Sequence, residues 1–270
     1  MSILLTGGTG LVGSRLVPRL AAAGFDVRVL LRRESQLPAG VKAVLGDLLE
    51  PESLVDAVSG VDAIIHLAAT FRRVEPEQIW KVNLEGTRNL IGATLKHAPQ
   101  ARFMMASTGN VYGSGHTHPA RESDPTNGQG AYPESKVAAE AELRASALNW
   151  SILRLPFVYG EGDGHLQALP DLASRLNYHP ARTMSMLHHR DIAVAFQLAL
   201  AGRMDGQIVN IADDAPVTVY EIVRIVGASY KESAEPVEPW EGWMDVSLVR
   251  ELGFVPTVPS LHQAVRDHVL

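Results

Sequence analysis

Short apolar runs alternate with amphipathic stretches over the first 155 residues of the chain. The apolar runs predict strands at 2–6, 26–31, 41–45, 62–67, 102–107 and 150–155. Between them, apolar residues recur with a helical period and predict helices at 11–23, 51–58, 77–97 and 131–148. Strands with continuous apolar centres are typical of a parallel sheet that is buried on both faces. The pattern therefore predicts an α/β fold built on a doubly wound parallel sheet.

The regular alternation ends at Pro156, after which prolines and glycines cluster at 156–164 and 236–259. A helix predicted at 191–201 and a strand predicted at 207–211 have the same character as the first half of the chain. We therefore expect a first domain over 1–155, to which residues 187–211 return. The remainder of 156–270 should form a small C-terminal lobe.

The composition narrows the classes of protein to which this chain can belong. Of its 270 residues, 46% are hydrophobic, which is enough for a large core, but no run of about 18 apolar residues predicts a transmembrane helix. The absence of cysteine excludes disulfides, thiolate metal sites and cysteine nucleophiles. A net charge of -6 without a dense Lys/Arg run argues against nucleic acid as a partner. We expect a cytoplasmic protein with no membrane partner.

A glycine-rich turn links the first predicted strand to the first predicted helix, with the sequence Thr6-Gly7-Gly8-Thr9-Gly10-Leu11-Val12-Gly13. The first glycine of such a turn permits a tight bend, the second lets the backbone approach a pyrophosphate, and the third lets the helix pack against the strand. The pyrophosphate would lie against N–H groups at the helix N-terminus. In this context the motif predicts a dinucleotide-binding domain over 1–155 rather than a turn without a ligand. The C-terminal lobe would then hold the substrate.

The end of the second strand indicates which dinucleotide is bound. NAD-preferring sites usually have an acidic residue there, which accepts hydrogen bonds from the ribose 2′-hydroxyl. This chain has Leu31 followed by Arg32 and Arg33. Because guanidinium groups pair well with phosphate, we expect NADP, with Arg32 as the main contact and NAD as the alternative. Solvated surface charge is the other interpretation of the two arginines.

Several further residues at the predicted carboxyl edge of the sheet could contact the cofactor. Asp47 could accept a hydrogen bond from the adenine amino group, or cap the helix that follows it. Ala68 and Ala69 follow the fourth strand, and their small side chains would let a cofactor lie against the sheet, or would merely pack the core. Asn83, which is polar in the middle of a predicted helix, could contact the cofactor or be a buried amide with internal partners.

Tyr132 and Lys136 stand four residues apart at the start of the predicted helix 131–148 and therefore share one of its faces. An ammonium group beside a phenol favours the phenolate and lowers its pKa, so that Tyr132 could exchange protons near neutral pH. Ser107 and Thr108 end the preceding strand, where a hydroxyl could hold a substrate oxygen against the phenol. These side chains form a candidate catalytic site.

The chain resembles the extended short-chain dehydrogenase/reductases, the NAD(P)-dependent epimerase/dehydratase family, in motifs that occur in the family's order. These motifs are the glycine-rich turn, Gly46-Asp47-Leu48, His66-Leu67-Ala68-Ala69, Val82-Asn83-Leu84-Glu85-Gly86-Thr87, Ser107-Thr108 with Val111-Tyr112-Gly113, Tyr132 with Lys136, and Arg154-Leu155-Pro156 with Val158-Tyr159-Gly160. The resemblance covers about the first 200 residues and implies a Rossmann fold, a nicotinamide cofactor and a small-molecule substrate.

The resemblance also implies a role for each candidate residue. Thr108 would be the hydroxyl of a catalytic triad, because it lies three residues before Val111, and Ser107 would line the cofactor pocket. Tyr132 would be the acid/base, and Lys136 would bind the nicotinamide ribose and tune Tyr132. The candidate cofactor contacts are Thr6, Gly7, Gly10, Leu11, Val12, Gly13, Arg32, Arg33, Asp47, Leu48, Leu67, Ala68, Ala69, Asn83, Ser107, Tyr132, Lys136 and Pro156. Relatives are often homodimers that pair the helices equivalent to those of Asn83 and Tyr132, and we expect the same by analogy.

Two positions depart from the pattern of nucleotide-sugar members. These members usually have an asparagine where this chain has Phe157 and an arginine where it has Met184. Neither side chain can donate a hydrogen bond to a phosphate, which weakens the case for a nucleotide-sugar substrate. We therefore expect an NAD(P)-dependent oxidoreductase that transfers hydride at a small alcohol or carbonyl compound. A nucleotide-sugar epimerase or dehydratase is the alternative, and a non-catalytic NADP-sensing protein is the least favoured interpretation because the tyrosine and lysine are both present.

The C-terminal lobe has no functional motif as specific as those of the first domain. We expect Trp240 and Trp243 to pack the small lobe, and Arg182 to be a solvated surface charge unless it serves a phosphate from another direction. The adjacent His188 and His189 lack acidic residues at a metal-ligand spacing on a helix, so no metal site is predicted.

Overall fold

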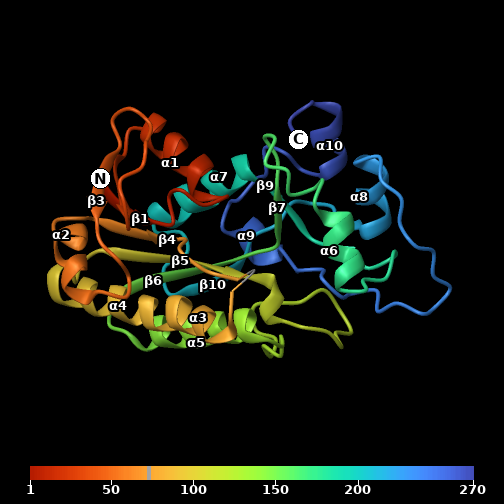
Figure 1. Ribbon diagram of the computed structural model, residues 1–270, viewed down its shortest axis with the longest axis horizontal. Coiled ribbons are helices and arrows are strands. Elements are labelled where there is room, and N and C mark those ends of the chain that lie inside the picture. Colours follow the sequence, from red (N-terminus) through yellow and green to blue (C-terminus); the bar gives the residue numbers. More distant parts are fainter. Residues whose placement is uncertain (72–73) are drawn as a thin grey trace.

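The computed structural model describes residues 1–71 and 74–270, and its core is a seven-stranded sheet (Figure 1). The strands are β1 (Ser2–Thr6), β2 (Asp26–Leu31), β3 (Lys42–Leu45), β4 (Ala63–His66), β5 (Arg102–Thr108), β6 (Asn149–Leu155) and β10 (Gln207–Asn210). All pairs are parallel, in the order β10-β6-β5-β4-β1-β2-β3. β1 pairs with β2 on one side and with β4 on the other, so the winding direction reverses there. This arrangement confirms the predicted doubly wound α/β sheet.

Helices cover both faces of the sheet, because successive side chains of a strand point to opposite faces. Ile3 and Leu5 of β1 pack in one cluster with α1 (Gly13–Ala22) and α7 (His189–Leu200). Leu4 packs in the opposite cluster with α2 (Val55–Val58), α4 (Gly86–His97) and α5 (Ala131–Ala145). A 3-10 turn, η1 (Pro51–Leu54), precedes α2. Figure 1 shows α1 and α7 above the sheet and α4 and α5 below it.

The prediction of one continuous helix at 77–97 is wrong, because a π-helical segment interrupts it. The structure has α3 (Pro76–Trp80), a π-helical segment η2 (Lys81–Glu85) and then α4. A π turn holds one more residue than an α turn, and apolar periodicity does not distinguish the two over so short a stretch. The helices predicted at 11–23 and 131–148 are also shorter in the structure: the first runs from Gly13 to Ala22, and the second ends at Ala145.

The residues after Pro156 form short elements beside the end of the sheet that carries the strand C-termini (Figure 1). These elements are β7 (Phe157–Tyr159), α6 (Leu169–Arg175), β8 (Thr183–Met184), β9 (Met186–His188), β11 (Val217–Thr218), α8 (Val219–Ile225), α9 (Ser247–Glu251) and α10 (Leu261–Arg266). β7 pairs with β9, and β8 pairs with β11. α9 packs with the main core through Val249, while α7 and β10 lie on the central sheet. In the described part of the chain, no helix combines the length and apolar character needed to cross a bilayer.

Candidate active site

A cleft of about 1140 Å³ opens at the carboxyl ends of the parallel strands and continues along the C-terminal lobe. The glycine turn, Leu67 after β4, Ser107 on β5 and Pro156 after β6 all line it. Ligands of doubly wound sheets bind at this edge, where the winding direction reverses. The volume exceeds the range of about 300–1,000 Å³ that is usual for one drug-sized ligand. The cleft therefore has room for a dinucleotide and a second molecule.

The backbone of the glycine turn forms a close-fitting cradle at the start of α1. Gly7 has a φ of +75°, and a Cβ there would lie 2.7 Å from the backbone nitrogen of Ala68. A Cβ at Gly13 would overlap the carbonyl oxygen of Gly7. Within α1 the N–H groups of Ser14 and Arg15 donate to the carbonyls of Gly10 and Val12, so the N–H groups left for a ligand are those of the turn itself, at Leu11, Val12 and Gly13 on the cleft lining. The turn therefore fits a pyrophosphate, as the sequence predicted.

The arginines and the acidic residue predicted to contact the adenosine half lie at the same sheet edge, outside the main cleft. Leu31 is buried at the end of β2, and Arg32 and Arg33 follow it as exposed side chains. Asp47 Oδ1 accepts a hydrogen bond from the backbone N–H of Leu49 at 2.9 Å, which fixes the turn after β3. Leu48 is buried, and it would meet a Cβ at Gly86 of α4 at 3.0 Å.

Thr6 is buried at the end of β1 and joins its strand to β4. Its Oγ1 lies 2.7 Å from His66 Nδ1 and accepts a bond from the backbone N–H of Ala68 at 3.3 Å. His66 Nε2 lies 3.0 Å from Thr87 Oγ1 on α4. Burial and the charge of Lys136 lower the pKa of His66 to about 3, so its ring is neutral at physiological pH. The Thr6 side chain therefore supports the strand ends that carry the cleft.

Asn83 lies on the π-helical segment and fixes the loop that follows β4. Its Oδ1 accepts a bond from the backbone N–H of Thr70 at 2.8 Å, and its Nδ2 donates to the carbonyl of Thr70 at 2.9 Å. The same Nδ2 donates to Ser135 Oγ on α5 at 3.0 Å. Asn83 is thus a buried amide with internal partners, and it positions Ala69 on the cleft wall.

Tyr132 and Thr108 both line the cleft, whereas Lys136 is buried in α5 and is not part of the lining. Tyr132, in the first turn of α5, lines the cleft with its ring 5.1 Å from that of Phe71. Lys136 follows one turn later and is only 2% exposed. Burial lowers the pKa of Lys136 to about 8, against the charge of Glu140, which works to raise it. Thr108 also lines the cleft, and its Oγ1 accepts a bond from the backbone N–H of Asn110 at 3.2 Å.

A buried polar network behind these residues was not predicted from the sequence. Ser107 donates a hydrogen bond to Glu140, whose carboxylate also accepts bonds from Arg154 Nε at 3.1 Å and Nη2 at 2.6 Å. Arg154 Nη1 donates to the Tyr112 hydroxyl at 2.9 Å, and that hydroxyl donates to Asn210 Oδ1 at 2.7 Å. Burial raises the pKa of Tyr112 to about 12. The available signal was an arginine inside an otherwise apolar strand and a glutamate in an alanine-rich helix.

Aromatic and apolar side chains of the C-terminal lobe form the far side of the cleft. Phe157 stacks on His165 with ring centroids 4.2 Å apart, and Met184 lies nearby on the lining. Trp240 and Trp243 pack against each other in the lobe, with their rings 5.2 Å apart, and they also line the cleft, which the sequence did not predict. Their segment is held over the cleft by long-range backbone contacts, including a hydrogen bond from Ser185 N–H to the carbonyl of Gly242 at 2.9 Å. Contacts of this kind leave no local sequence pattern.

Arg182 was predicted to be a solvated surface charge, but the structure places it on the cleft with an ion-pair partner. It lines the cleft, and its Nη1 forms an ion pair with Glu241 Oε1 at 2.5 Å. Its guanidinium lies 4.0 Å from the centroid of the Tyr178 ring. The position of Arg182 thus depends on Tyr178, one helical-turn length before it in sequence, and on Glu241, which is 59 residues away.

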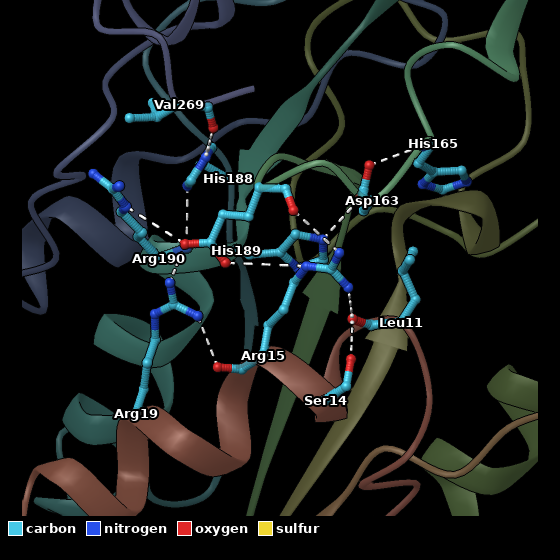
Figure 2. A network of polar contacts seen from close by, with 11 residues as sticks. Leu11, Ser14, Arg15, Arg19, Asp163, His165, His188, His189, Arg190 and Val269 are labelled. Carbon is cyan, nitrogen blue, oxygen red and sulfur yellow. Dashed lines mark hydrogen bonds and ion pairs between the residues drawn. The ribbon is translucent and has the colours of Figure 1, made fainter. Parts of the chain in front are cut away.

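A cluster of charged residues joins α1 to the loop after β7 (Figure 2). The Glu161 carboxylate pairs with Arg19, and it lies 4.0 Å from Arg15 Nε and 3.6 Å from Arg190 Nε of α7. Burial works to raise the pKa of Glu161, but Arg19 together with His188 and His189 holds that pKa below its usual range. Arg15 also donates to the carbonyl of Leu11 at 3.1 Å. The helix that begins at the glycine turn is therefore tied to the C-terminal lobe.

The two adjacent histidines at the start of α7 belong to the same network (Figure 2). His188 Nε2 donates to the carbonyl of Val269 at 2.8 Å, and His189 Nε2 lies 2.8 Å from Asp163 Oδ2. Among the residues that the structure describes, no group of three or more His, Asp or Glu side chains is placed to hold a metal ion.

The doubly wound sheet, the glycine turn and the cleft together define a dinucleotide-binding α/β enzyme. The chain belongs to the NAD dependent epimerase/dehydratase family, whose model matches residues 3–212 and confirms the expected resemblance. A 3-beta-hydroxysteroid dehydrogenase of Mycolicibacterium neoaurum is 31% identical over 254 residues, which are 83% of this chain and 69% of that protein. A ceramide reductase of Caulobacter vibrioides is 33% identical over 199 residues, which are 71% of this chain but 58% of that protein. The solved structure of MoeE5 in complex with UDP-glucuronic acid and NAD has a TM-score of 0.80 and 26% identity, and covers 98% of this chain and 97% of its own.

Proposed function

We propose that this enzyme is an NADP-preferring oxidoreductase that interconverts an alcohol and a carbonyl compound, with Tyr132 as the acid/base. One observation carries the proposal: the glycine turn, Thr108 and Tyr132 line a single cleft, with Lys136 buried one helical turn beyond the phenol. A bound nicotinamide dinucleotide supplies a hydride or accepts one.

The side chains of the cleft divide the remaining work. The N–H groups of Leu11, Val12 and Gly13 hold the pyrophosphate, and Ala69 and Pro156 give the nicotinamide half a small-residue wall. Thr108 Oγ1 orients the substrate oxygen, and Tyr132 gives a proton to that oxygen or takes one from it. With a pKa of about 8, Lys136 is mainly protonated at pH 7, and its charge stabilises the phenolate form of Tyr132.

The preference for NADP rests on the end of β2. Arg32 and Arg33 are exposed at the carboxyl edge of the sheet, and the residue before them is a buried leucine rather than an acid. We expect Arg32→Ala to weaken NADP binding about tenfold, since a hydrogen bond to a charged group contributes about 1.5–3 kcal/mol, and to leave NAD binding unchanged. Arg144→Ala, at an exposed position on α5, is the control. Equal weakening of both dinucleotides by Arg32→Ala would contradict this assignment.

A nucleotide-sugar epimerase or dehydratase is the second candidate, because MoeE5 matches nearly the whole chain and its structure holds UDP-glucuronic acid. Such an enzyme regenerates its cofactor in each cycle, whereas an oxidoreductase consumes NADPH in proportion to the carbonyl compound reduced. Net NADPH consumption, followed by its absorbance, separates the two functions.

Tyr132→Phe tests the acid/base assignment. We expect kcat to fall by about 10²–10⁴, which is the usual contribution of general acid–base catalysis, while NADPH affinity is retained. Tyr220→Phe, at an exposed position on α8, is the matched control. Unchanged turnover in the Tyr132 variant would show that another group carries the proton.

A further inference from the structure

The half of the cleft that lies beyond Tyr132 is bounded by an apolar wall, formed by Phe157, Leu172, Leu176, Met184, Trp240 and Trp243. Leu176 is 53% exposed, and Phe71, which also lines the cleft, is 46% exposed. Large apolar side chains that gather in a concave site without being covered are typical of a binding surface for an apolar ligand. The wall comes from β7, α6, β8 and the segment 240–243, so four separate parts of the chain contribute to it.

The charges on the cleft lining point to an uncharged ligand. Of the described residues that line the cleft, only Arg182 and Glu241 carry a fixed charge, and they pair with each other at 2.5 Å. The Tyr178 ring covers the guanidinium of Arg182 from one side. A diphosphate would have to break this ion pair to gain a cationic partner there, and would leave the Glu241 carboxylate unpaired in the cleft.

We infer that the substrate is an uncharged alcohol or ketone with a large apolar body, and not a nucleotide sugar. Its reacting oxygen lies at Tyr132 and Thr108, and its apolar body lies on the apolar wall. The inference rests on the proposed function for the reaction, but the wall and the paired charges define the ligand class by themselves. Phe157 and Met184, the two side chains that cannot donate to phosphate, are both members of the wall.

The first test measures NADPH consumption with a ladder of unbranched methyl ketones from four to ten carbons. Each methylene that is buried on the wall should raise kcat/KM about fourfold until the wall is covered. UDP-glucose, added to the NADPH-loaded enzyme, should neither bind in calorimetry nor inhibit the ten-carbon ketone at millimolar concentration. The inference would be overturned by a kcat/KM that does not rise with chain length. It would also be overturned if UDP-glucose inhibits competitively with an inhibition constant below the KM of the ten-carbon ketone.

Two variants locate the effect on the wall. Leu176→Ala and Trp243→Ala should each lower kcat/KM for the ten-carbon ketone about tenfold or more. Both should keep kcat/KM for the four-carbon ketone within about twofold, because a molecule of that size does not reach the wall. Val255→Ala, at a 72% exposed position that is not on the cleft lining, should leave both values unchanged. Unaltered NADPH affinity in each variant shows that the fold is intact.

A third arm separates failure of the inference from failure of the proposed function. If no ketone is reduced, the proposed function is wrong, and calorimetric binding of the ten-carbon secondary alcohol to the NADP-loaded protein still decides the ligand class. Binding that Leu176→Ala weakens about tenfold would support the apolar site. Absence of binding would overturn it.

Discussion

Replacement of Lys136 by methionine should make the protein more stable and inactive at the same time. Lys136 is 2% exposed, and Met has a similar length and no charge to bury. Burial lowers the pKa of this lysine from 10.5 to about 8, so the folded protein disfavours the protonated form. At about 1.36 kcal/mol for each pKa unit, folding with a charged Lys136 costs about 3 kcal/mol at pH 7.

The pH dependence of this cost has a definite sign. Between the folded pKa of about 8 and the unfolded value of 10.5, the unfolded chain holds more protons on Lys136 than the folded chain does. Stability therefore rises with pH across this window as the lysine loses its charge in the folded state. We expect Lys136→Met to raise the free energy of unfolding by about 3 kcal/mol at pH 7, and expect this advantage to fall towards zero as the pH approaches 10.5.

Urea denaturation followed by circular dichroism, at pH 7 and at several values up to pH 10, measures the difference. No dinucleotide is added, because ligand binding would contribute its own stabilisation. Turnover should be lost in Lys136→Met, since the proposed role of Lys136 is to supply the charge that stabilises the phenolate of Tyr132. Lys96→Met, at an exposed position on α4, is the matched control and should change stability by less than about 0.5 kcal/mol. A destabilised Lys136→Met protein at pH 7, or a stability difference that does not depend on pH, would refute the reasoning.

Three other substitutions test the supports of the site. Glu140→Gln should lower the free energy of unfolding in urea by about 3–5 kcal/mol, because it leaves the Arg154 guanidinium buried without its ion-pair partner. The double variant Glu140→Gln with Arg154→Met should recover most of that loss. Equal stability of the single and double variants would contradict this reasoning. Asn83→Leu should cost about 1–3 kcal/mol for each backbone group of Thr70 left unpaired, and a cost below this range would show that water replaces the amide. Gly13→Ala should abolish dinucleotide binding in calorimetry, because a Cβ there would overlap the carbonyl oxygen of Gly7. Gly92→Ala is the control and should preserve binding, because the space around its Cβ position on α4 is open. Retained binding in Gly13→Ala would show that the turn can relax.

The sheet could be predicted because each of its strands carries its own signal. β1, β4 and β5 are buried on both faces, so each is a continuous apolar run that the alternation with helices makes easy to recognise. The glycine turn was predictable for a related reason: the positive φ of Gly7 and the crowding at Gly13 are local demands that only glycine meets. The family match confirms the nicotinamide-dependent family that these local patterns indicated.

The residues whose positions could not be predicted from the sequence depend on contacts between distant segments. Trp240 and Arg182 are on the cleft because the 240–244 segment pairs with β8 and its neighbours, and no local period encodes that pairing. The partners of Glu140 lie 14 and 33 residues away, on β6 and β5, so the glutamate looked like one more polar position of a helix. Periodicity reports burial of apolar faces, whereas buried ion pairs are visible only once the strands are assembled.

The π-helical segment has a consequence for how the chain tolerates insertions and deletions. A π turn takes up one extra residue without changing how the helix before it is rotated relative to the helix after it. Ile79 is buried ahead of η2 and Leu90 is buried after it, so both side chains face the protein in the rotation that the bulge preserves. Deleting one residue other than Asn83 between 81 and 85 would therefore give a regular helix and leave Ile79 on the cleft that it lines. The same deletion within the regular turns of α4 would rotate one part of the helix by about 100° relative to the other, so a one-residue gap is best tolerated in the π-helical segment.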